Sequence, residues 1–316
     1  MVLTVTLNPS VDRALFVDQI VVGDANRVIR SETDAGGKGI NLSRVLCELG
    51  GHTIATGFIA GGPGAYICRA LDMQGLRHAF VEVKGETRTN VSVEDSGHGL
   101  PTTFNERGPE IDAHDIDRLF ARIREHIDTA DWITVGGSLP PGTPPQTFRE
   151  LVELAHTAGK KILVDADGEA MRLAMEAKPD MIKPNEKEAA RLLGQPIDGR
   201  NDAIQAAESL YAQLGGGERI VVVSRGAGGA AMVCADGTFD GVSPNVEMKS
   251  TIGCGDSMLG GMLWAIQNGL CLEESLRWGL AAGAATASTD GTEIARKPVV
   301  DRLFPSAKVE RDSKPS

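Results

Sequence analysis

The chain has 316 residues, a formal net charge of −11, 41% hydrophobic residues and 24% charged residues. This length can hold one large α/β domain or two smaller ones, and it allows a substantial core. Because the chain is acidic and shows no basic face, we expect it not to bind nucleic acid, whose phosphates require positive charge. Its apolar runs are shorter than a transmembrane helix, so we expect no membrane association.

The cysteine pattern argues against a disulfide framework and against a zinc site. The chain has five cysteines, an odd number, and they form no C-x-x-C pair. The apolar N-terminus is short, lacks a basic region and meets Asn8-Pro9, which is typical of a buried first strand and not of a signal peptide. We therefore expect a reduced, cytoplasmic protein.

Hydrophobic periodicity predicts alternating strands and helices along most of the chain. In chain order we expect a strand over 2–7, a helix over 39–49, a strand over 53–59, helices over 64–75 and 112–127, a strand over 132–135 and a helix over 145–158. There follow a strand over 161–165, a helix over 168–176, a strand over 180–183, helices over 186–193 and 202–214, a strand over 219–224, hairpin strands over 229–241, and helices over 256–268 and 272–288. This alternation predicts an α/β fold with a mostly parallel central sheet covered on both faces.

Two β-like segments, about 12–34 and 87–105, interrupt the alternation. The first contains short apolar alternations, and the second contains a Gly97–Gly99 turn. We interpret both as a small β-sheet lid inserted into a single domain that spans residues 1–308. The last residues, 309–316, are polar, and we expect this tail to fray.

The segment Thr251–Ser257 carries the most chemistry and runs straight into an apolar helical pattern. Gly253 and Gly255 allow the backbone to approach a ligand closely, and the free N–H groups at a helix start suit an anion. Asp256 lies beside them as a carboxylate that can accept a proton. An anion cradle beside a base indicates phosphoryl transfer to a hydroxyl; the alternative is a turn with ordinary helix-dipole compensation.

Further segments follow predicted strands or precede predicted helices, and chemistry in such folds gathers at the carboxyl ends of strands. The segment Asp34–Asn41 is not a P-loop, because Lys38 is followed by Gly39. It forms either a sugar pocket, with Lys38 and Asn41 as hydrogen-bonding groups, or a tight turn before a core helix.

The segment Lys183–Glu188 also has two interpretations. Asn185 followed by Glu188 is a capping-box pattern, but the same residues could lie near a water-coordinated Mg²⁺. The segment Ser224–Gly229 enters a hairpin and not a helix, which excludes a dinucleotide fingerprint and leaves a backbone wall for a nucleotide.

Three polar side chains elsewhere could capture a phosphate. The loop 136–142 exposes one hydroxyl, that of Ser138, and the two lid segments carry Arg27 and Arg88. Arginine suits bidentate capture of a phosphate. A lone strand arginine is usually solvated surface, an interpretation that fits Arg27 better than Arg88.

Together and in this order, the motifs resemble those of the PfkB/ribokinase family of carbohydrate kinases. They are T-L-N-P-x-x-D at 6–12, A-G-G-K-G-I-N at 35–41, G-S-L-P-P-G at 137–142, K-P-N-x-x-E at 183–188 and G-x-G-D-S at 253–257. The first motif, with Asn26-Arg27-Val28 and Thr87–Asn90, most resembles the phosphosugar branch of the family. The resemblance implies a ribokinase-like fold of three αβα layers with a small β-sheet lid.

The resemblance also implies a role for each matching residue. Asp256 would be the general base, and the amides of Gly253, Cys254 and Gly255 would bind the charge of the transferred phosphoryl group. The sugar phosphate would be bound by Asp12, Gly37, Lys38, Asn41, Arg88, Asn90, Ser138 and Arg27. ATP would be bound by Lys183, Asn185, Ser224, Gly226, Gly229 and Thr251, and Mg²⁺ would be held through water by Asn185 and Glu188. The lid would pair with a second subunit in a homodimer.

The implied reaction is ATP-dependent phosphorylation of a ketohexose phosphate, with fructose 1-phosphate first and tagatose 6-phosphate or fructose 6-phosphate as alternatives. A kinase of free sugars or nucleosides fits less well, because Lys38, Arg88 and Arg27 supply more positive charge than a neutral sugar needs. The presence of Asp256 argues against a sensor that binds without turnover. Cys254 stands where the family usually has alanine, and we expect the helix start to lower the pKa of its thiol and make activity sensitive to thiol reagents.

Overall fold

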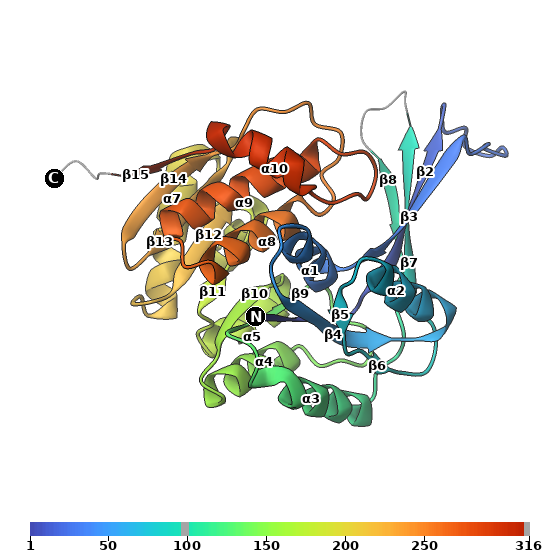
Figure 1. Ribbon diagram of the computed structural model, residues 1–316, viewed down its shortest axis with the longest axis horizontal. Helices are drawn as coiled ribbons and strands as arrows, with labels where there is room; N and C mark the ends of the chain where they lie inside the picture. Colours follow the sequence, from blue (N-terminus) through green and yellow to red (C-terminus); the bar gives the residue numbers. More distant parts are fainter. Residues whose placement is uncertain (96–100, 313–316) are drawn as a thin grey trace.

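The computed structural model describes residues 1–95 and 101–312 of the chain. A large sheet carries helices on both faces, and a smaller sheet projects from one side of this body (Figure 1). The strand order of the large sheet is β15-β14-β13-β12-β11-β10-β9-β1-β4-β5, and β6 also pairs with β4. Neighbours from β12 to β5 are parallel, whereas β13, β14 and β15 are added antiparallel at one edge. The predicted α/β fold class is therefore confirmed.

The strands of the large sheet are mostly short. They are β1 (Val2–Thr6), β4 (Thr53–Ile59), β5 (Arg77–His78), β6 (Val81–Glu82), β9 (Trp132–Gly136), β10 (Lys161–Asp165), β11 (Met181–Ile182), β12 (Ile220–Ser224), β13 (Ala230–Cys234), β14 (Gly237–Val242) and β15 (Lys308–Arg311). Side chains alternate between the two faces of this sheet. Leu3 and Val5 pack into one core and Val2 into the other, which is why the strands are apolar at consecutive positions.

Helices cover both faces and form two cores with the sheet. One face carries α3 (Ala113–Ile127), α4 (Gln146–Thr157), α5 (Gly168–Glu176), α6 (Glu186–Leu193) and α7 (Gly199–Leu214). The other carries α1 (Lys38–Glu48), α8 (Cys254–Gln267), α9 (Leu272–Ala287) and α10 (Lys297–Leu303). The structure thus has the expected three layers, although the short helix α10 was not predicted from the sequence.

The smaller sheet, here called the lid, has the strand order β3-β2-β7-β8. Its strands are β2 (Ser10–Val17), β3 (Arg30–Gly36), β7 (Arg88–Asp95) and β8 (Thr102–Asn105). They stand together at the upper right of Figure 1, beside α2 (Gly61–Met73), and away from β13 and β15. The predicted lid segments therefore form one sheet, while the predicted Gly97–Gly99 turn lies outside the described residues.

The predicted polar tail differs from the structure at its beginning. Residues 309–311 belong to β15, which pairs antiparallel with β14 from Phe239↔Arg311 to Val242↔Lys308. An isolated polar segment gains little by folding, but here the open edge of a sheet supplies hydrogen-bond partners. Residues 313–316 of the predicted tail lie outside the described residues. In the described part of the chain, the helices are too short or too polar to cross a membrane.

Candidate active site

A cavity of about 440 Å³ opens at the carboxyl ends of the parallel strands. Twelve of the nineteen predicted site residues line it, among them all of the phosphoryl-transfer and nucleotide sets. The predicted residues that line it are Lys38, Lys183, Asn185, Glu188, Ser224, Gly226, Gly229, Thr251, Gly253, Cys254, Gly255 and Asp256. Predicted residues from four separate segments therefore meet around one space, at the end of the strands where open parallel sheets bind ligands.

Asp256 lies in the first turn of α8, at the inner end of this cavity. Gly253 is the N-cap of the helix with φ 72°, a left-handed conformation that glycine adopts without strain. The carboxylate of Asp256 is 8% exposed and accepts a hydrogen bond from Asn41 Nδ2 at 2.9 Å. Burial raises the pKa of Asp256 to about 6, and the nearby charge of Lys38 limits that rise. A carboxyl group tuned in this way can take a proton near neutral pH.

Three charged groups interact electrostatically with Asp256, namely the buried Asp165 and Lys183 and the partly exposed Lys38. The Nζ atom of Lys38 lies 3.0 Å from Asp165 Oδ1, and the Nζ atom of Lys183 lies 3.8 Å from Asp165 Oδ2. Burial favours neutral Asp165, but Lys183 and Lys38 outweigh burial and lower its pKa. Burial likewise lowers the pKa of Lys38, but Asp165 and Asp256 outweigh it and the net shift is upward. Lys38 and Asp165 are therefore charged at neutral pH.

The importance of Asp165 was missed in the sequence. Asp165 is the last residue of β10, so its position at the carboxyl end of a central strand was the available signal. Its two lysine partners come from α1 and from the segment after β11. Because these residues are far apart in the chain, no local sequence pattern predicts that they pair. A carbon added at Gly255 would lie 3.1 Å from Lys183 Nζ, so that ammonium group sits directly at the start of α8.

The sugar-binding prediction places several residues on the lid and at its base. Asp12 and Asn90 are partners in the register of β2 and β7, and Asn90 Nδ2 donates to Asp12 Oδ1 at 2.9 Å. Ser10 donates to the same oxygen at 2.6 Å. Gly37 is the N-cap of α1, which begins at Lys38 and carries Asn41 in its first turn. The structure thus joins the lid residues and α1 through the short segment that ends β3.

A second cluster gathers Arg88 and Ser138 around Asn8. The backbone carbonyl of Asn8 accepts from Arg88 Nε at 3.2 Å, and Asn8 Nδ2 donates to Ser138 Oγ at 3.2 Å. Asn8 itself is 4% exposed and was named in the sequence only as part of a motif. A neighbouring hollow of about 440 Å³ is lined by Ser138, Lys38 and Glu188, so it adjoins the first cavity. This arrangement brings one fixed guanidinium group and one hydroxyl to the same side of the site.

Arg27 is not part of this cluster. It lies in the exposed loop between β2 and β3, not in a lid strand as expected. The register of these strands ends at Phe16↔Arg30, four residues beyond Asp12, which is about 14 Å along an antiparallel strand. The prediction that Arg27 binds the sugar phosphate is therefore not supported within one chain.

The nucleotide side of the cavity has a backbone wall and a floor of small residues. Ser224 ends β12, Gly226 begins a short 3₁₀ turn (Gly226–Gly228), and Gly229 follows this turn before β13, as expected from a segment that enters a hairpin. This wall is fixed by Arg225, whose Nη2 donates to Asp240 Oδ1 at 2.6 Å. The sequence missed two further groups of lining residues: the segment 243–246 with Met248, and the α9 residues Gly279, Leu280, Gly283, Ala284 and Ala287. Glycine and alanine at spacings of four and three along one helix were the available signal for the second group.

Asn185 and Glu188 form the capping box that the sequence also allowed. Asn185 Oδ1 accepts from the Glu188 amide, and Glu188 Oε2 accepts from the Asn185 amide, both at 2.9 Å. One carboxylate oxygen of Glu188 thus remains for other partners. Among the described residues, the buried carboxylate oxygens of Asp165 have no partner beyond the ammonium groups of Lys38 and Lys183. Within the described residues no cluster of three His, Cys, Asp or Glu could hold a metal alone. This donor set fits Mg²⁺ that keeps waters and phosphate oxygens as its other ligands.

The expectation for Cys254 is wrong. Burial and the neighbouring carboxylate of Asp256 raise the pKa of its thiol to about 11, and the sulfur donates to the Ser250 carbonyl at 3.6 Å. The sequence placed this thiol correctly at a helix start but could not reveal its burial. The thiol is therefore protonated at neutral pH and a weak nucleophile.

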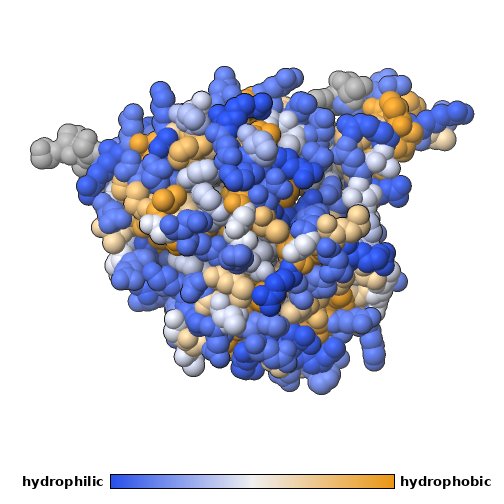
Figure 2. Space-filling model, in the orientation of Figure 1, coloured by the Kyte–Doolittle hydropathy of each residue, from blue (hydrophilic) through white to orange (hydrophobic). Residues whose placement is uncertain are grey.

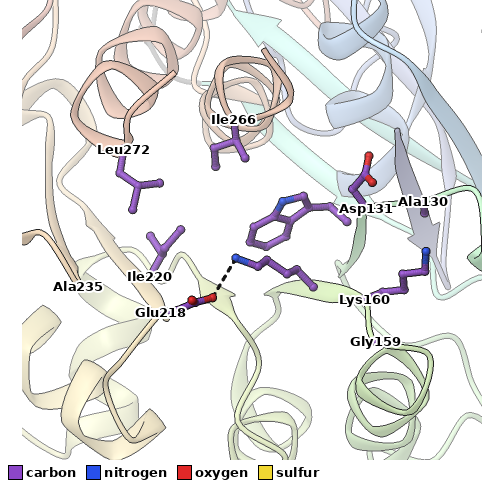
Figure 3. Close-up of a pocket in the computed structure, with 11 residues that line it drawn as sticks. Ala130, Asp131, Gly159, Lys160, Glu218, Ile220, Ala235, Ile266 and Leu272 are labelled. Atoms are coloured by element: carbon purple, nitrogen blue, oxygen red, sulfur yellow. Dashed lines mark hydrogen bonds and ion pairs between the residues drawn. The ribbon is translucent and has the colours of Figure 1, made fainter. Parts of the chain in front are cut away.

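A larger hollow, about 570 Å³, lies at the opposite, amino end of the same strands (Figure 3). Its walls include Ile220, Ile266 and Leu272, and its rim carries the ion pair between Lys161 Nζ and Glu218 Oε2 at 3.5 Å. None of the predicted site residues lines it. The volume of a hollow therefore does not identify the candidate site. The buried charged residues at the carboxyl end of the strands identify it.

Known proteins match this chain along nearly its whole length. The model of the pfkB family of carbohydrate kinases matches residues 5–298. The 1-phosphofructokinase of Bacillus subtilis (strain 168) is 34% identical over 98% of this chain and 100% of that protein, and the 1-phosphofructokinase of Rhodobacter capsulatus is 35% identical over 87% and 86%. The crystal structure of phosphofructokinase-2 from Escherichia coli in complex with potassium gives a TM-score of 0.89 at 30% identity, covering 96% of this chain and 98% of that one.

Proposed function

Because the chain belongs to the pfkB family of carbohydrate kinases, we propose that it transfers the terminal phosphoryl group of ATP to a hydroxyl of a ketohexose phosphate. The observation that carries the proposal is the buried carboxylate of Asp256, whose pKa is about 6, at the N-terminus of α8. An acceptor hydroxyl beside Asp256 and a phosphoryl group at the helix start would be aligned for in-line transfer.

The chain contributes positioning and charge to this reaction. Asp256 accepts the proton of the attacking hydroxyl, and Asn41 holds the carboxylate in place through its 2.9 Å hydrogen bond. The free amides at the start of α8, those of Gly253, Cys254 and Gly255, stabilise the negative charge that develops on the transferred group. Lys183, against Gly255, adds a positive charge at the same point.

Fructose 1-phosphate is the first candidate for the acceptor. Both named relatives that support it are 1-phosphofructokinases, at 34% and 35% identity. Arg88 and Ser138 would hold the existing phosphate, while Asp12, Asn90, Gly37 and Asn41 would hold the sugar, and Lys38 would contact both. Fructose 6-phosphate and tagatose 6-phosphate are the alternatives, since all three substrates combine a ketose with one phosphate.

ATP would occupy the side of the cavity formed by the 3₁₀ turn and the small residues of α9. Ser224, Gly226, Gly229 and Thr251 would contact the nucleotide, and Lys183 and Asn185 its phosphates. Glu188 and Asn185 would hold Mg²⁺ through water, and the carboxylate of Asp165, which pairs with Lys38 and Lys183, would add negative charge near the same ion. When bound, Mg²⁺ neutralises charge on the phosphates of ATP.

The lid would also form a homodimer. Exposed apolar side chains gather on it, and Figure 2 shows a cluster of apolar colour at the upper right, where the lid lies. They are Val21, Val22, Val28, Ile29 and Phe104. Apolar clusters of this kind mark surfaces that bind other proteins. The five cysteines are all free, which fits a reducing, cytoplasmic compartment.

A coupled assay of ADP release tests the function. The purified protein is mixed with ATP–Mg²⁺ and, separately, fructose 1-phosphate, fructose 6-phosphate, tagatose 6-phosphate, fructose or ribose. We expect the highest kcat/KM with fructose 1-phosphate. A preference for another phosphosugar would reassign the acceptor, turnover of free sugars alone would contradict the phosphate-binding role of Arg88, and silence with every acceptor would contradict the kinase proposal.

A further inference from the structure

The loop between α9 and α10, residues 288–296, contacts both the lid and the segment that leads into α8. Thr292 in this loop is buried, and its Oγ1 donates to Asp34 Oδ2 at 2.6 Å. Asp34 belongs to β3, whereas Thr292 lies 258 positions further along the chain. The loop therefore joins the sheet that carries Asp12 to the helix pair that carries Asp256.

Asp34 is the lid residue that accepts the hydrogen bond from Thr292. It stands directly opposite Asp12 in the register of β2 and β3, so both carboxylates share one face of the lid. Like charges opposite each other are unfavourable, and the buried Arg44 of α1 offsets this by donating to Asp34 Oδ1 at 2.8 Å. Arg44 also donates to the Ala35 carbonyl at 3.0 Å, so the base of β3 is fixed to α1.

Gly291, the residue before Thr292, contacts both sides at once. A carbon added at its Cα would lie 2.2 Å from Glu32 Oε2, so the Glu32 side chain of β3 lies against this backbone, and the φ of +59° favours glycine here. The carbonyl of Gly291 accepts from Ser250 Oγ at 2.9 Å. Ser250 Oγ in turn accepts from the amide of Ile252 at 3.2 Å, just before the N-cap Gly253. Three hydrogen bonds thus connect the base of the lid to the start of α8: Thr292 to Asp34, Ser250 to Gly291, and Ile252 to Ser250.

A second connection fixes the loop to α8 itself. The amide of Ala295 donates to Thr286 Oγ1 at 2.8 Å, and Thr286 Oγ1 donates to Ser257 Oγ at 2.7 Å. Ser257 follows Asp256 and is fully buried. The loop therefore holds α8 on both sides of the amides that would bind the phosphoryl group.

We propose that the hydrogen bond between Thr292 and Asp34 couples the sugar side of the site to the phosphoryl-binding amides of α8, which makes both residues positioning residues. Sugar binding at Asp12 sets the position of β2 and β3, and the loop transmits that position to residues 250–257. Coupling of this kind is reciprocal, so the nucleotide must then also change the affinity for the sugar phosphate by the same factor. The proposal rests on the proposed function.

Three variants of threonine in the same loop test it. Thr292→Val removes the hydroxyl but keeps the branched shape, and Thr292→Ser keeps the hydroxyl. Thr289→Val is the matched control. The Thr289 hydroxyl donates hydrogen bonds to the carbonyls of Thr286, at the end of α9, and Glu293, in the same loop, and neither of these residues belongs to the lid. Calorimetry gives the Kd of fructose 1-phosphate with and without a saturating non-hydrolysable ATP analogue, and the ratio of the two is the coupling factor.

We expect a coupling factor of about fivefold or more in the unaltered protein, in Thr292→Ser and in Thr289→Val. In Thr292→Val the factor should fall to about one, with faster amide hydrogen exchange in both 30–36 and 250–257. An unchanged factor in Thr292→Val, or the same loss in Thr289→Val, would overturn the coupling. Failure of the unaltered protein to bind any phosphosugar would instead overturn the proposed function, and unchanged exchange in the unliganded Thr292→Val variant would then reject the coupling separately.

Discussion

The two ends of the central sheet carry hollows of similar size and very different chemistry. At the carboxyl end, Asp165, Lys183 and Asp256 are each less than 9% exposed in the walls of a cavity of about 440 Å³. At the amino end, the hollow of about 570 Å³ has an apolar floor, and its ion pair joins Lys161 and Glu218, whose side chains are 49% and 87% exposed. The larger hollow is the one without buried charge.

This difference teaches where the fold accepts an energetic penalty. Burying one charged group costs several kcal/mol, which is comparable to the whole free energy of unfolding of a domain. An exposed ion pair such as Lys161–Glu218 contributes about 0–1 kcal/mol and requires no such penalty. Of these two hollows, the one with buried charged residues is therefore the candidate active site. Variants at both ends of the sheet test this distinction.

The largest effect is expected for Asp256→Asn. This variant keeps the shape and one hydrogen bond to Asn41 but removes the base, so kcat should fall by about 10²-fold or more. The matched control is Glu218→Gln at the amino end, which should leave kcat unchanged. Steady-state kinetics of both variants with the preferred phosphosugar gives the comparison, and an Asp256→Asn enzyme with normal kcat would remove Asp256 from the mechanism.

The next effect concerns stability. Asp165→Asn leaves the buried Lys183 and the partly exposed Lys38 without their shared counter-charge, so the free energy of unfolding should fall by about 3–5 kcal/mol. Lys161→Met at the amino end should change it by at most about 1 kcal/mol. Urea unfolding monitored by circular dichroism measures both, and equal effects at the two ends would contradict the comparison. Because the pKa of Asp165 is lowered, its stabilisation is present above the ordinary aspartate pKa and is lost as the pH falls through the lowered value.

Arg88→Ala should act on binding more than on chemistry. A charge-assisted hydrogen bond to the substrate phosphate exists before and during transfer, so KM for the phosphosugar should rise about 10- to 100-fold with little change in kcat. Arg77→Ala, an exposed arginine of β5, is the matched control for loss of one positive charge. If the KM values of both variants equal that of the unaltered enzyme, the phosphate is held elsewhere.

The pH dependence should show an acid limb near pH 6. Below the raised pKa of Asp256 the carboxyl is protonated and cannot accept a proton, so kcat/KM should fall about tenfold per pH unit. The substrate phosphate also titrates near pH 6, so its pKa is measured in parallel by phosphorus NMR. Lys38→Met, which removes the charge that lowers the pKa of Asp256, should move the limb upward, whereas a limb that follows the substrate alone would exclude Asp256 as its origin.

The smallest effect is expected from thiol reagents. Cys271, exposed at the start of α9 next to Leu272 of the amino-end hollow, should react first and without loss of activity. Cys254 should react slowly at neutral pH because its pKa is raised to about 11. Mass spectrometry during inactivation follows both sites, and rapid loss of activity in step with Cys254 modification would contradict the burial argument.

Local patterns predicted most of the fold and the central residues of the site. Gly253 and Gly255 before an apolar helix marked the start of α8, and the alternation of strands placed four site segments at one end of a sheet. The pairing of Asp165 with both lysines was not predictable, because it joins residues from separate segments. The burial that raises the pKa of Cys254, the loop position of Arg27 and the pairing of β15 likewise depend on tertiary contacts that no sequence window contains.

The pairing of β15 has a consequence for the behaviour of the protein at high concentration. Without β15, the outer strand β14 would present a row of unpaired backbone groups, a template on which other chains can aggregate. With β15 in place, the outermost strand is short and carries Lys308, Glu310 and Arg311, all exposed. Charged side chains on a short edge discourage further strand addition. The last strand of the chain thus protects the sheet against aggregation.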